Sequence, residues 1–193
     1  WHGRDLKELL KETFKKIQND PAIRLNNSWH RRRVLYKHLI KKLGSAKKRI
    51  WIINAYFVPD NMLLKSLVDA AKTNIDVKII LPRKADVLIP VPWVSSTFYE
   101  NLLKNNIKIY EYKPHMLHSK VFIIDDWVIV GSSNLDHFSL LHNLEIDLKI
   151  SKQENKRIVE NHFGQLLNES NELNLKNWKI HRCRPCCSSC HNI

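Results

Sequence analysis

The residues best suited to chemistry lie in one short stretch, from His118 to Asn134. This stretch contains an imidazole, an ammonium group, a hydroxyl and an amide, from His118, Lys120, Ser132 and Asn134. An imidazole can act as a nucleophile or carry a proton near neutral pH. Lysine, hydroxyl and amide donors, with the backbone amides near Gly131, supply the positive field that a phosphoryl group in transfer needs. The pattern therefore indicates phosphodiester chemistry.

The spacing of these residues suggests how they are held together. Alternate side chains of a strand share a face, so His118 and Lys120 are expected to point the same way, with Asp125 at the far end of the strand. Gly131 opens a Gly-Ser-Ser-Asn turn after the next strand. A glycine there would let the backbone approach a phosphate closely. We expect this turn to fold back beside His118.

Residues 143–150 alternate between polar and apolar side chains, which predicts a strand. The apolar face holds Leu144, Ile146, Leu148 and Ile150, and the polar face holds Asn143, Glu145, Asp147 and Lys149. Glu145 is then a candidate carboxylate to accept the imidazole N–H and fix its tautomer. The alternative, which the periodicity alone favours, is that Glu145 is simply an exposed strand residue.

Hydrophobic periodicity predicts the elements that position these residues. Helices are expected within residues 4–18, 34–43, 63–71, 98–103 and 158–167, and strands within 50–57, 77–81, 107–112, 118–124, 127–130 and 143–150. The first strands alternate with helices, which is typical of crossover units, and the later ones follow each other closely. We predict an α/β fold with a mixed, largely parallel β-sheet flanked by helices.

The composition is that of a basic globular domain. The chain has 193 residues, 44% of them hydrophobic, which suits one domain with a real core. Its net charge of +13 favours polyanionic partners, either nucleic acid or an anionic membrane surface, although lysine-rich helices are also common as solvated faces. The chain begins at Trp1, without a signal peptide, so we expect it to derive from a longer protein that could carry a targeting or membrane segment.

Several separated motifs resemble one known family. The pattern His118-x-Lys120-x4-Asp125, followed by Gly131-Ser132-x-Asn134, resembles the HKD motif of the phospholipase D superfamily. With the segments 54–60, 109–112, 131–136, 139–140 and 143–145, the chain is similar over about residues 30–170 to the C-terminal half of a bacterial cardiolipin synthase. The connection from Asp125 to Gly131 is one residue shorter than the family pattern, which leaves Asp125 and Asp126 as alternatives for the motif's aspartate.

The resemblance implies a reaction without metal or cofactor at a site built from two HKD motifs. One histidine attacks phosphorus to give a phosphohistidine, the other protonates the leaving alcohol, and a second alcohol or water resolves the intermediate. The resemblance makes His118 the nucleophile or the general acid, and its C-terminal position favours the general acid. Lys120 and Asn134 would hold the phosphate and Ser132 would assist. Asp125 would support the motif, and Glu145 would orient an imidazole.

The chain carries one such motif, so the other must come from an absent N-terminal half or from a second copy across a two-fold axis. We expect residues 1–28 to be a helix and linker that end a preceding half. Residues 29–170 are expected to form the HKD domain, and residues 171–193 a Cys-rich, disordered tail. An isolated monomer is expected to be inactive.

Three hypotheses follow for function. The first is a phosphatidyltransferase acting on phosphatidylglycerol at the cytoplasmic face of the bacterial membrane, either peripheral or anchored by a missing segment. The second is a homodimeric phospholipase D-like nuclease or phosphodiesterase, whose partner would be nucleic acid. The third is a non-catalytic remnant that binds membranes or nucleic acid. Segments 54–60 and 143–145 favour the first hypothesis.

Other features carry less weight. The apolar loop 87–94 is expected either to touch acyl chains through Trp93 or to pack ordinarily. Four cysteines between residues 183 and 190 have Cys-x2-Cys spacing, but their crowding favours a disordered tail over a zinc knot. His115, His137 and His142 lack metal-ligand spacing with a partner.

Overall fold

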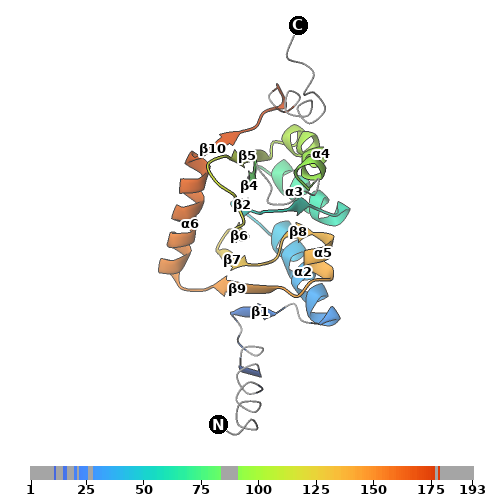
Figure 1. Ribbon diagram of the computed structural model, residues 1–193, viewed down its shortest axis with the longest axis vertical. Helices are drawn as coiled ribbons and strands as arrows, with labels where there is room; N and C mark the ends of the chain where they lie inside the picture. The colour runs from blue at the N-terminus through green and yellow to red at the C-terminus, as the bar shows by residue number, and fades with distance from the viewer. Residues whose placement is uncertain are drawn as a thin grey trace.

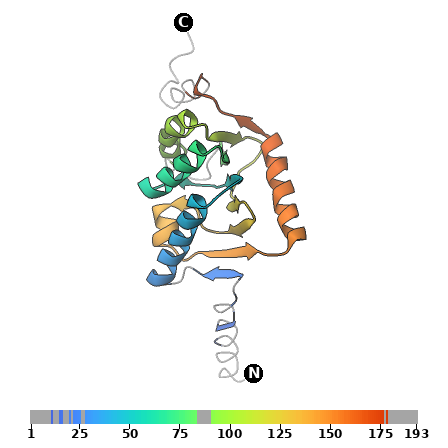
Figure 2. The same ribbon diagram turned by 180° about the vertical axis from the view of Figure 1, so that it is seen from behind.

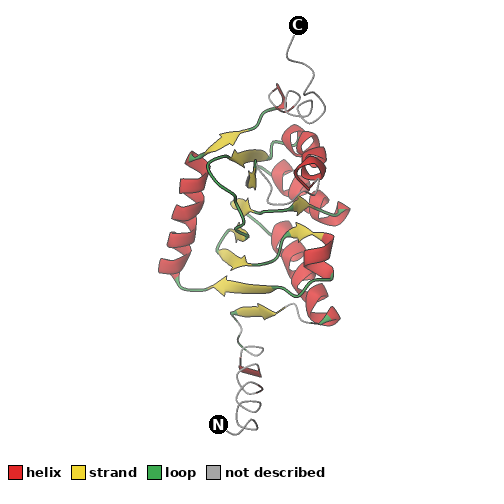
Figure 3. Ribbon diagram, in the orientation of Figure 1, coloured by secondary structure: helices red, strands yellow, loops and turns green. Residues whose placement is uncertain are grey.

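The computed structural model describes residues 11, 15–16, 20, 22–25, 28–83, 91–176 and 178. Its helices are α2 (Trp29–Gly44), α3 (Asn61–Lys72), α4 (Val91–Lys104), α5 (His137–Leu141) and α6 (Gln153–Asn168). Its strands are β1 (Ile23–Leu25), β2 (Arg49–Ile53), β3 (Phe57–Val58), β4 (Asp76–Pro82), β5 (Lys108–Tyr112), β6 (Val121–Ile124), β7 (Trp127–Gly131), β8 (Leu135–Asp136), β9 (Ile146–Ile150) and β10 (Ser170–Glu172). Figure 1 shows their arrangement and Figure 3 separates helices from strands by colour.

Eight strands form one mixed sheet in the order β1-β9-β7-β6-β2-β4-β5-β10. Strands β2, β4 and β5 are parallel, because helices α3 and α4 carry the chain back between them. The other ladders of this sheet are antiparallel. The mixed sheet flanked by helices is confirmed, but its parallel part is smaller than the expected largely parallel sheet. The reason is that β6, β7 and β9 follow one another without a crossover helix.

Helices cover the two faces of the sheet unequally (Figures 1 and 2). On one face, α2, α3, α4 and α5 enclose the larger core, which includes Ile52, Ile79 and Phe122 from the central strands. On the other face, α6 supplies Phe163 and Leu166 to a smaller core. Within the described residues, α6 is thus the helix that packs against this face of the sheet.

Local capping explains where two of these helices begin. The Ser28 side chain accepts a hydrogen bond from the backbone N–H of Arg31, so α2 starts earlier than its apolar periodicity indicates. Asp60 caps α3 by accepting from the N–H of Leu63 at 2.8 Å, and it also accepts from the Tyr36 hydroxyl. That second contact joins α2 to the start of α3.

The structure differs from some of the sequence expectations, and other expectations concern residues that it does not describe. Residues 91–94 belong to α4 rather than to the expected apolar loop, since a proline in the first turn of a helix lacks only an N–H that would be unpaired there. Strand β9 begins at Ile146, later than expected. The expected helix within residues 4–18, the loop residues 84–90 and the cysteines lie largely or wholly outside the described residues.

Within the part of the chain that is described, no helix is long and apolar enough to cross a membrane.

The β6–β7 hairpin is fastened to the start of β2 by one carboxylate. Asp125, in the left-handed region at φ 50°, accepts hydrogen bonds from the backbone N–H groups of Lys47, Lys48 and Arg49 at 2.8–3.0 Å. Burial alone would raise the pKa of Asp125, but these three hydrogen bonds more than offset it and hold the pKa below its ordinary value. Neighbouring Asp126 is exposed.

Replacing Asp125 by Asn should remove the charge and leave one side-chain oxygen to accept hydrogen bonds. We expect Asp125→Asn to lower the free energy of unfolding by about 1–2 kcal/mol at neutral pH. Because the folded pKa is depressed, this contribution is present above the unfolded pKa and is lost as pH falls through the folded pKa. Urea unfolding across acidic and neutral pH measures it. Asp126→Asn is the matched control, and equal stability of the two variants at neutral pH would contradict the capping role.

Candidate active site

The candidate site forms where four connections meet at one end of the sheet. Because β2 and β6 are antiparallel, Ile53 at the end of β2 pairs with Val121 at the start of β6. In the same way, Gly131 at the end of β7 pairs with Asp147 near the start of β9. The segments after β2 and β7 and before β6 and β9 therefore lie at the same end of the strands. These segments carry the residues that the motifs predicted.

His118 and Lys120 lie together at this end of the sheet. The Lys120 side chain is buried, and its Nζ lies 2.7 Å from the carbonyl oxygen of His118 and 2.9 Å and 3.1 Å from the ring nitrogens Nδ1 and Nε2. The His118 residue itself is exposed, with the ring of Tyr56 edge-on at a centroid distance of 6.1 Å. Burial lowers the pKa of Lys120, and attraction to Glu145 opposes that shift. An accessible imidazole thus sits over a fixed ammonium group.

The turn after β7 is hydrogen-bonded to β9 through Ser132. Its backbone N–H donates to the carbonyl of Ile146 at 3.0 Å, and the N–H of Ile146 donates to its Oγ at 2.9 Å. The Ser132 hydroxyl donates to the Glu145 carboxylate. Glu145 is therefore in the site, half-buried and near Lys120, but its hydrogen bond within the described structure goes to Ser132 rather than to His118.

Asp147, which the sequence pattern assigned to the polar face of residues 143–150, has a buried carboxylate. It is 1% exposed and accepts hydrogen bonds from Ser133, from Oγ at 2.6 Å and from the backbone N–H at 3.2 Å. Burial raises its pKa, and the bonds from Ser133 only partly counteract this. A Cβ on Gly131 would stand 2.0 Å from Asp147 Oδ1. Residue 131 must therefore lack a side chain so that Asp147 of β9 fits beside it. In the sequence, this glycine was the available indication that a side chain packs closely against the turn.

Two buried amides follow β2 and β7 at this end of the sheet. The Nδ2 of Asn134 donates to Ser139 Oγ at 3.4 Å, while its Oδ1 is buried without a hydrogen-bond partner. Asn54, fully buried after β2, accepts from the N–H of Leu135 at 3.0 Å, and its own Nδ2 is likewise unpaired. Asn54 therefore positions the residue next to Asn134, a role that its motif alone did not reveal.

The remaining candidates lie elsewhere. Asp125 occupies the opposite end of β6 from Lys120, where its carboxylate is engaged by backbone amides, so the structure does not bring it into the site. This contact also distinguishes Asp125 from the exposed Asp126. His115 and His142 are exposed. Among the residues that the structure describes, no group of three or more His, Cys, Asp or Glu side chains is placed to hold a metal ion.

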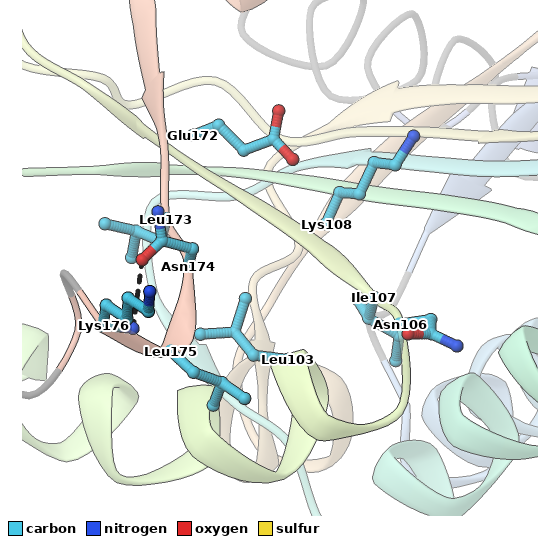
Figure 4. A pocket seen from close by; sticks show the side chains of 9 residues that line it. All are labelled: Leu103, Asn106, Ile107, Lys108, Glu172, Leu173, Asn174, Leu175 and Lys176. Carbon is cyan, nitrogen blue, oxygen red and sulfur yellow. Dashed lines mark hydrogen bonds between the residues drawn. The ribbon is translucent and has the colours of Figure 1, made fainter.

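A pocket of about 780 Å³ lies beside the edge strand β10, between the end of α4, β5 and the segment after β10 (Figure 4). Apolar side chains of Leu103, Ile107, Leu173 and Leu175 contribute to it, with Lys108 and Glu172 among its polar members. None of the candidate site residues lines this pocket. It is separate from the His118 site.

The chain matches a family model described as "Cardiolipin synthase, PLD-like domain" over residues 39–167. It is 35% identical over 161 residues to Cardiolipin synthase 2 of Bacillus anthracis, covering 81% of this chain and 30% of that protein. It is 37% identical over 139 residues to Cardiolipin synthase B of Salmonella typhi, covering 71% of this chain and 33% of the relative. The chain thus spans about a third of the length of these relatives.

Solved structures share the fold. The phospholipase D family member Nuc from Salmonella typhimurium superposes with a TM-score of 0.63 at 21% identity, covering 79% of this chain and 96% of that one. NucT from Helicobacter pylori gives a TM-score of 0.66 at 20% identity, covering 78% and 97%. At such identities the likeness concerns the fold.

Replacing Gly131 by Ala should destabilise the protein by about 1–3 kcal/mol, because the new Cβ would overlap Asp147 and the carbonyl oxygen of Ile146. Gly164 within α6 is the matched control, since a Cβ there meets nothing within 4 Å. Gly164→Ala should stabilise by about 0.5–1 kcal/mol through helix propensity. Chemical denaturation of both variants measures the difference. A Gly131→Ala protein as stable as Gly164→Ala would show that the close packing is not required.

Asp147 should make stability depend on pH. Its folded pKa is raised by burial, so its contribution to stability is fully present below the unfolded pKa and is lost as pH rises through the folded pKa. The amide introduced by Asp147→Asn does not titrate. The unfolding free energy of Asp147→Asn relative to the parent protein should therefore increase from acidic to neutral pH. Denaturation curves of both proteins across that range test this, and a relative decrease would contradict it.

Proposed function

The chain belongs to the cardiolipin synthase family of phospholipase D-like proteins, and we propose that it is one catalytic half of a phosphatidyltransferase acting on phosphatidylglycerol. The observation that carries this proposal is the exposed imidazole of His118 above the buried ammonium group of Lys120. The hydroxyl of Ser132 and the amide of Asn134 lie in the turn after β7, at the same end of the sheet. These are the groups that phosphoryl transfer needs, an acid or nucleophile within a positive field.

The proposed reaction passes through a phosphohistidine. A histidine nitrogen attacks the phosphorus of phosphatidylglycerol, and the P–O bond to the glycerol headgroup breaks as the P–N bond forms. The second histidine gives its proton to the departing glycerol oxygen. It then takes the proton from a hydroxyl of another phosphatidylglycerol, whose oxygen displaces the histidine from phosphorus. The product is cardiolipin, and we assign the proton-transfer role to His118.

The neighbouring groups support these steps. Lys120 would bind a phosphate oxygen and stabilise its charge as it builds up, since a buried cation acts strongly in a site of low dielectric. Asn134 would hold a second oxygen, and Ser132 would assist. Glu145 would orient an imidazole of the assembled site, and its attraction for Lys120 opposes the burial that lowers the pKa of that ammonium group. Asp125 would support the motif from the far end of β6.

The site is proposed to be one half of a two-motif centre, so an isolated monomer should be inactive. The second HKD half would come from the same longer protein or from a homodimer. The net charge of +13 suits an anionic phospholipid surface. We place the protein at the cytoplasmic face of the bacterial membrane, held peripherally or by a segment outside this sequence.

A second candidate is a homodimeric nuclease or phosphodiesterase with nucleic acid as its partner. The observation that favours it is coverage: this fold accounts for 96% and 97% of the chains of Nuc and NucT, so one such unit can be nearly a whole protein. The same positive charge would then serve a phosphate backbone. Transfer remains the first proposal because the family model and the relatives are those of cardiolipin synthases.

The two functions are separated by one assay. The purified chain, alone and mixed with an upstream half expressed separately, is incubated with phosphatidylglycerol vesicles and with single-stranded DNA. We expect cardiolipin to form only in the assembled protein, and His118→Ala to lower its rate by about 100-fold or more because a proton-transfer group is lost. His115→Ala, a nearby exposed imidazole, is the control and should leave the rate unchanged. DNA cleavage by the chain alone, without lipid turnover, would overturn the transferase proposal.

A further inference from the structure

The segment that joins β2 to β3, residues 54–56, contacts both groups of candidate site residues. The Tyr56 ring meets the ring of His118 at a centroid distance of 6.1 Å, and the two ring planes are nearly perpendicular, at 81°. Two residues earlier, the Asn54 side chain accepts a hydrogen bond from the backbone N–H of Leu135, which follows the turn after β7. One short segment therefore connects the histidine of the site with the turn that carries the site's amide.

Both ends of this segment are anchored in the fold. The backbone N–H of Asn54 donates to a carbonyl oxygen of β4 at 3.2 Å, and the Asn54 side chain is fully buried. On the other side, Phe57 is fully buried, pairs with β8 in the parallel β3–β8 ladder, and packs against Phe98 with a centroid distance of 6.4 Å. Tyr56 is half-buried between these two anchors. Its backbone is therefore held on both sides, which limits where its ring can lie.

The His118 ring needs a neighbour that holds it in both protonation states. The Lys120 ammonium group lies 2.9 Å and 3.1 Å from the two ring nitrogens, and it can donate only to a nitrogen that has no proton. Once the imidazole carries two N–H groups, as a proton donor must, the ring offers Lys120 no acceptor and the two cations repel. The contact with Tyr56 uses no acceptor nitrogen, because perpendicular rings with centroids roughly 4.5–7 Å apart attract through their edges and faces.

We propose that Tyr56 is a positioning residue for His118. Its ring keeps the imidazole in one orientation while a proton passes to and from the substrate oxygen; in this respect the inference rests on the proposed function. Because Asn54 and β3 tie the same segment to the residues after Asn134, the imidazole and the turn after β7 keep a fixed spacing. The contact is made by the ring, so phenylalanine should replace Tyr56 and an aliphatic side chain should not.

The first test uses the full 193-residue chain without lipid. The NMR signals of the His118 ring, assigned by their absence from His118→Ala, report the nearby aromatic ring through its ring current. Tyr56→Leu should move these signals toward those of a free histidine, and Tyr56→Phe should leave them near their original positions. Tyr36→Leu is the control: it removes another half-buried tyrosine together with its hydrogen bond to Asp60, and the His118 signals should stay in place despite the loss of stability.

The second test follows turnover of phosphatidylglycerol vesicles by the chain assembled with its separately expressed upstream half. Tyr56→Leu should lower kcat by about two- to tenfold, as expected for the loss of one aromatic pair, with KM unchanged, and Tyr56→Phe should keep the original rate. His118 signals that do not respond to Tyr56→Leu, a Tyr56→Phe protein as slow as Tyr56→Leu, or a rise in KM alone would each overturn the proposal. An assembled protein that makes no cardiolipin would refute only the proposed function, because the NMR signals still decide whether Tyr56 positions the ring.

Discussion

The structure of the site depends on how the turn after β7 is bonded to β9. Ser132 and Ser133 bind β9 through side chain and backbone alike, and the buried carboxylate of Asp147 lies directly beneath Gly131. This contact fixes the turn that carries Asn134, at the end of the sheet where His118 and Lys120 precede β6. Burying a carboxylate is costly unless it is hydrogen-bonded, and here Ser133 donates from its hydroxyl and its backbone N–H, with a further backbone contribution from Ser132.

The same register has a second consequence. Side chains alternate along a strand, so turning Asp147 inward places Ile146 and Leu148 outward. The orientation of β9 therefore anchors the turn that we propose binds phosphate, and it leaves apolar side chains exposed at the border of that turn. Among the described residues, the candidate site and the exposed apolar side chains lie side by side because β9 contributes to both.

Much of this could be predicted from the sequence, and the failures have definite causes. The HKD spacing located His118 and Lys120, although both precede β6 and do not lie within the predicted strand, and glycine in a turn is also a local signal. The face of β9 could not be predicted, since apolar alternation normally points inward and only the tertiary contact of Asp147 with Ser133 decides otherwise. The predicted extent of parallel pairing was too large for a similar reason, because strand order is set by long-range contacts. The amide of Asn54 acts on Leu135, far along the chain, and no local pattern shows that.

The central claim is that the assembled site transfers a phosphatidyl group between two lipids. The most direct measurement follows glycerol and cardiolipin together during turnover of phosphatidylglycerol vesicles by the assembled protein. Transfer predicts equal amounts of the two products throughout the reaction. Release of glycerol with phosphatidic acid in place of cardiolipin would show hydrolysis instead and contradict the account.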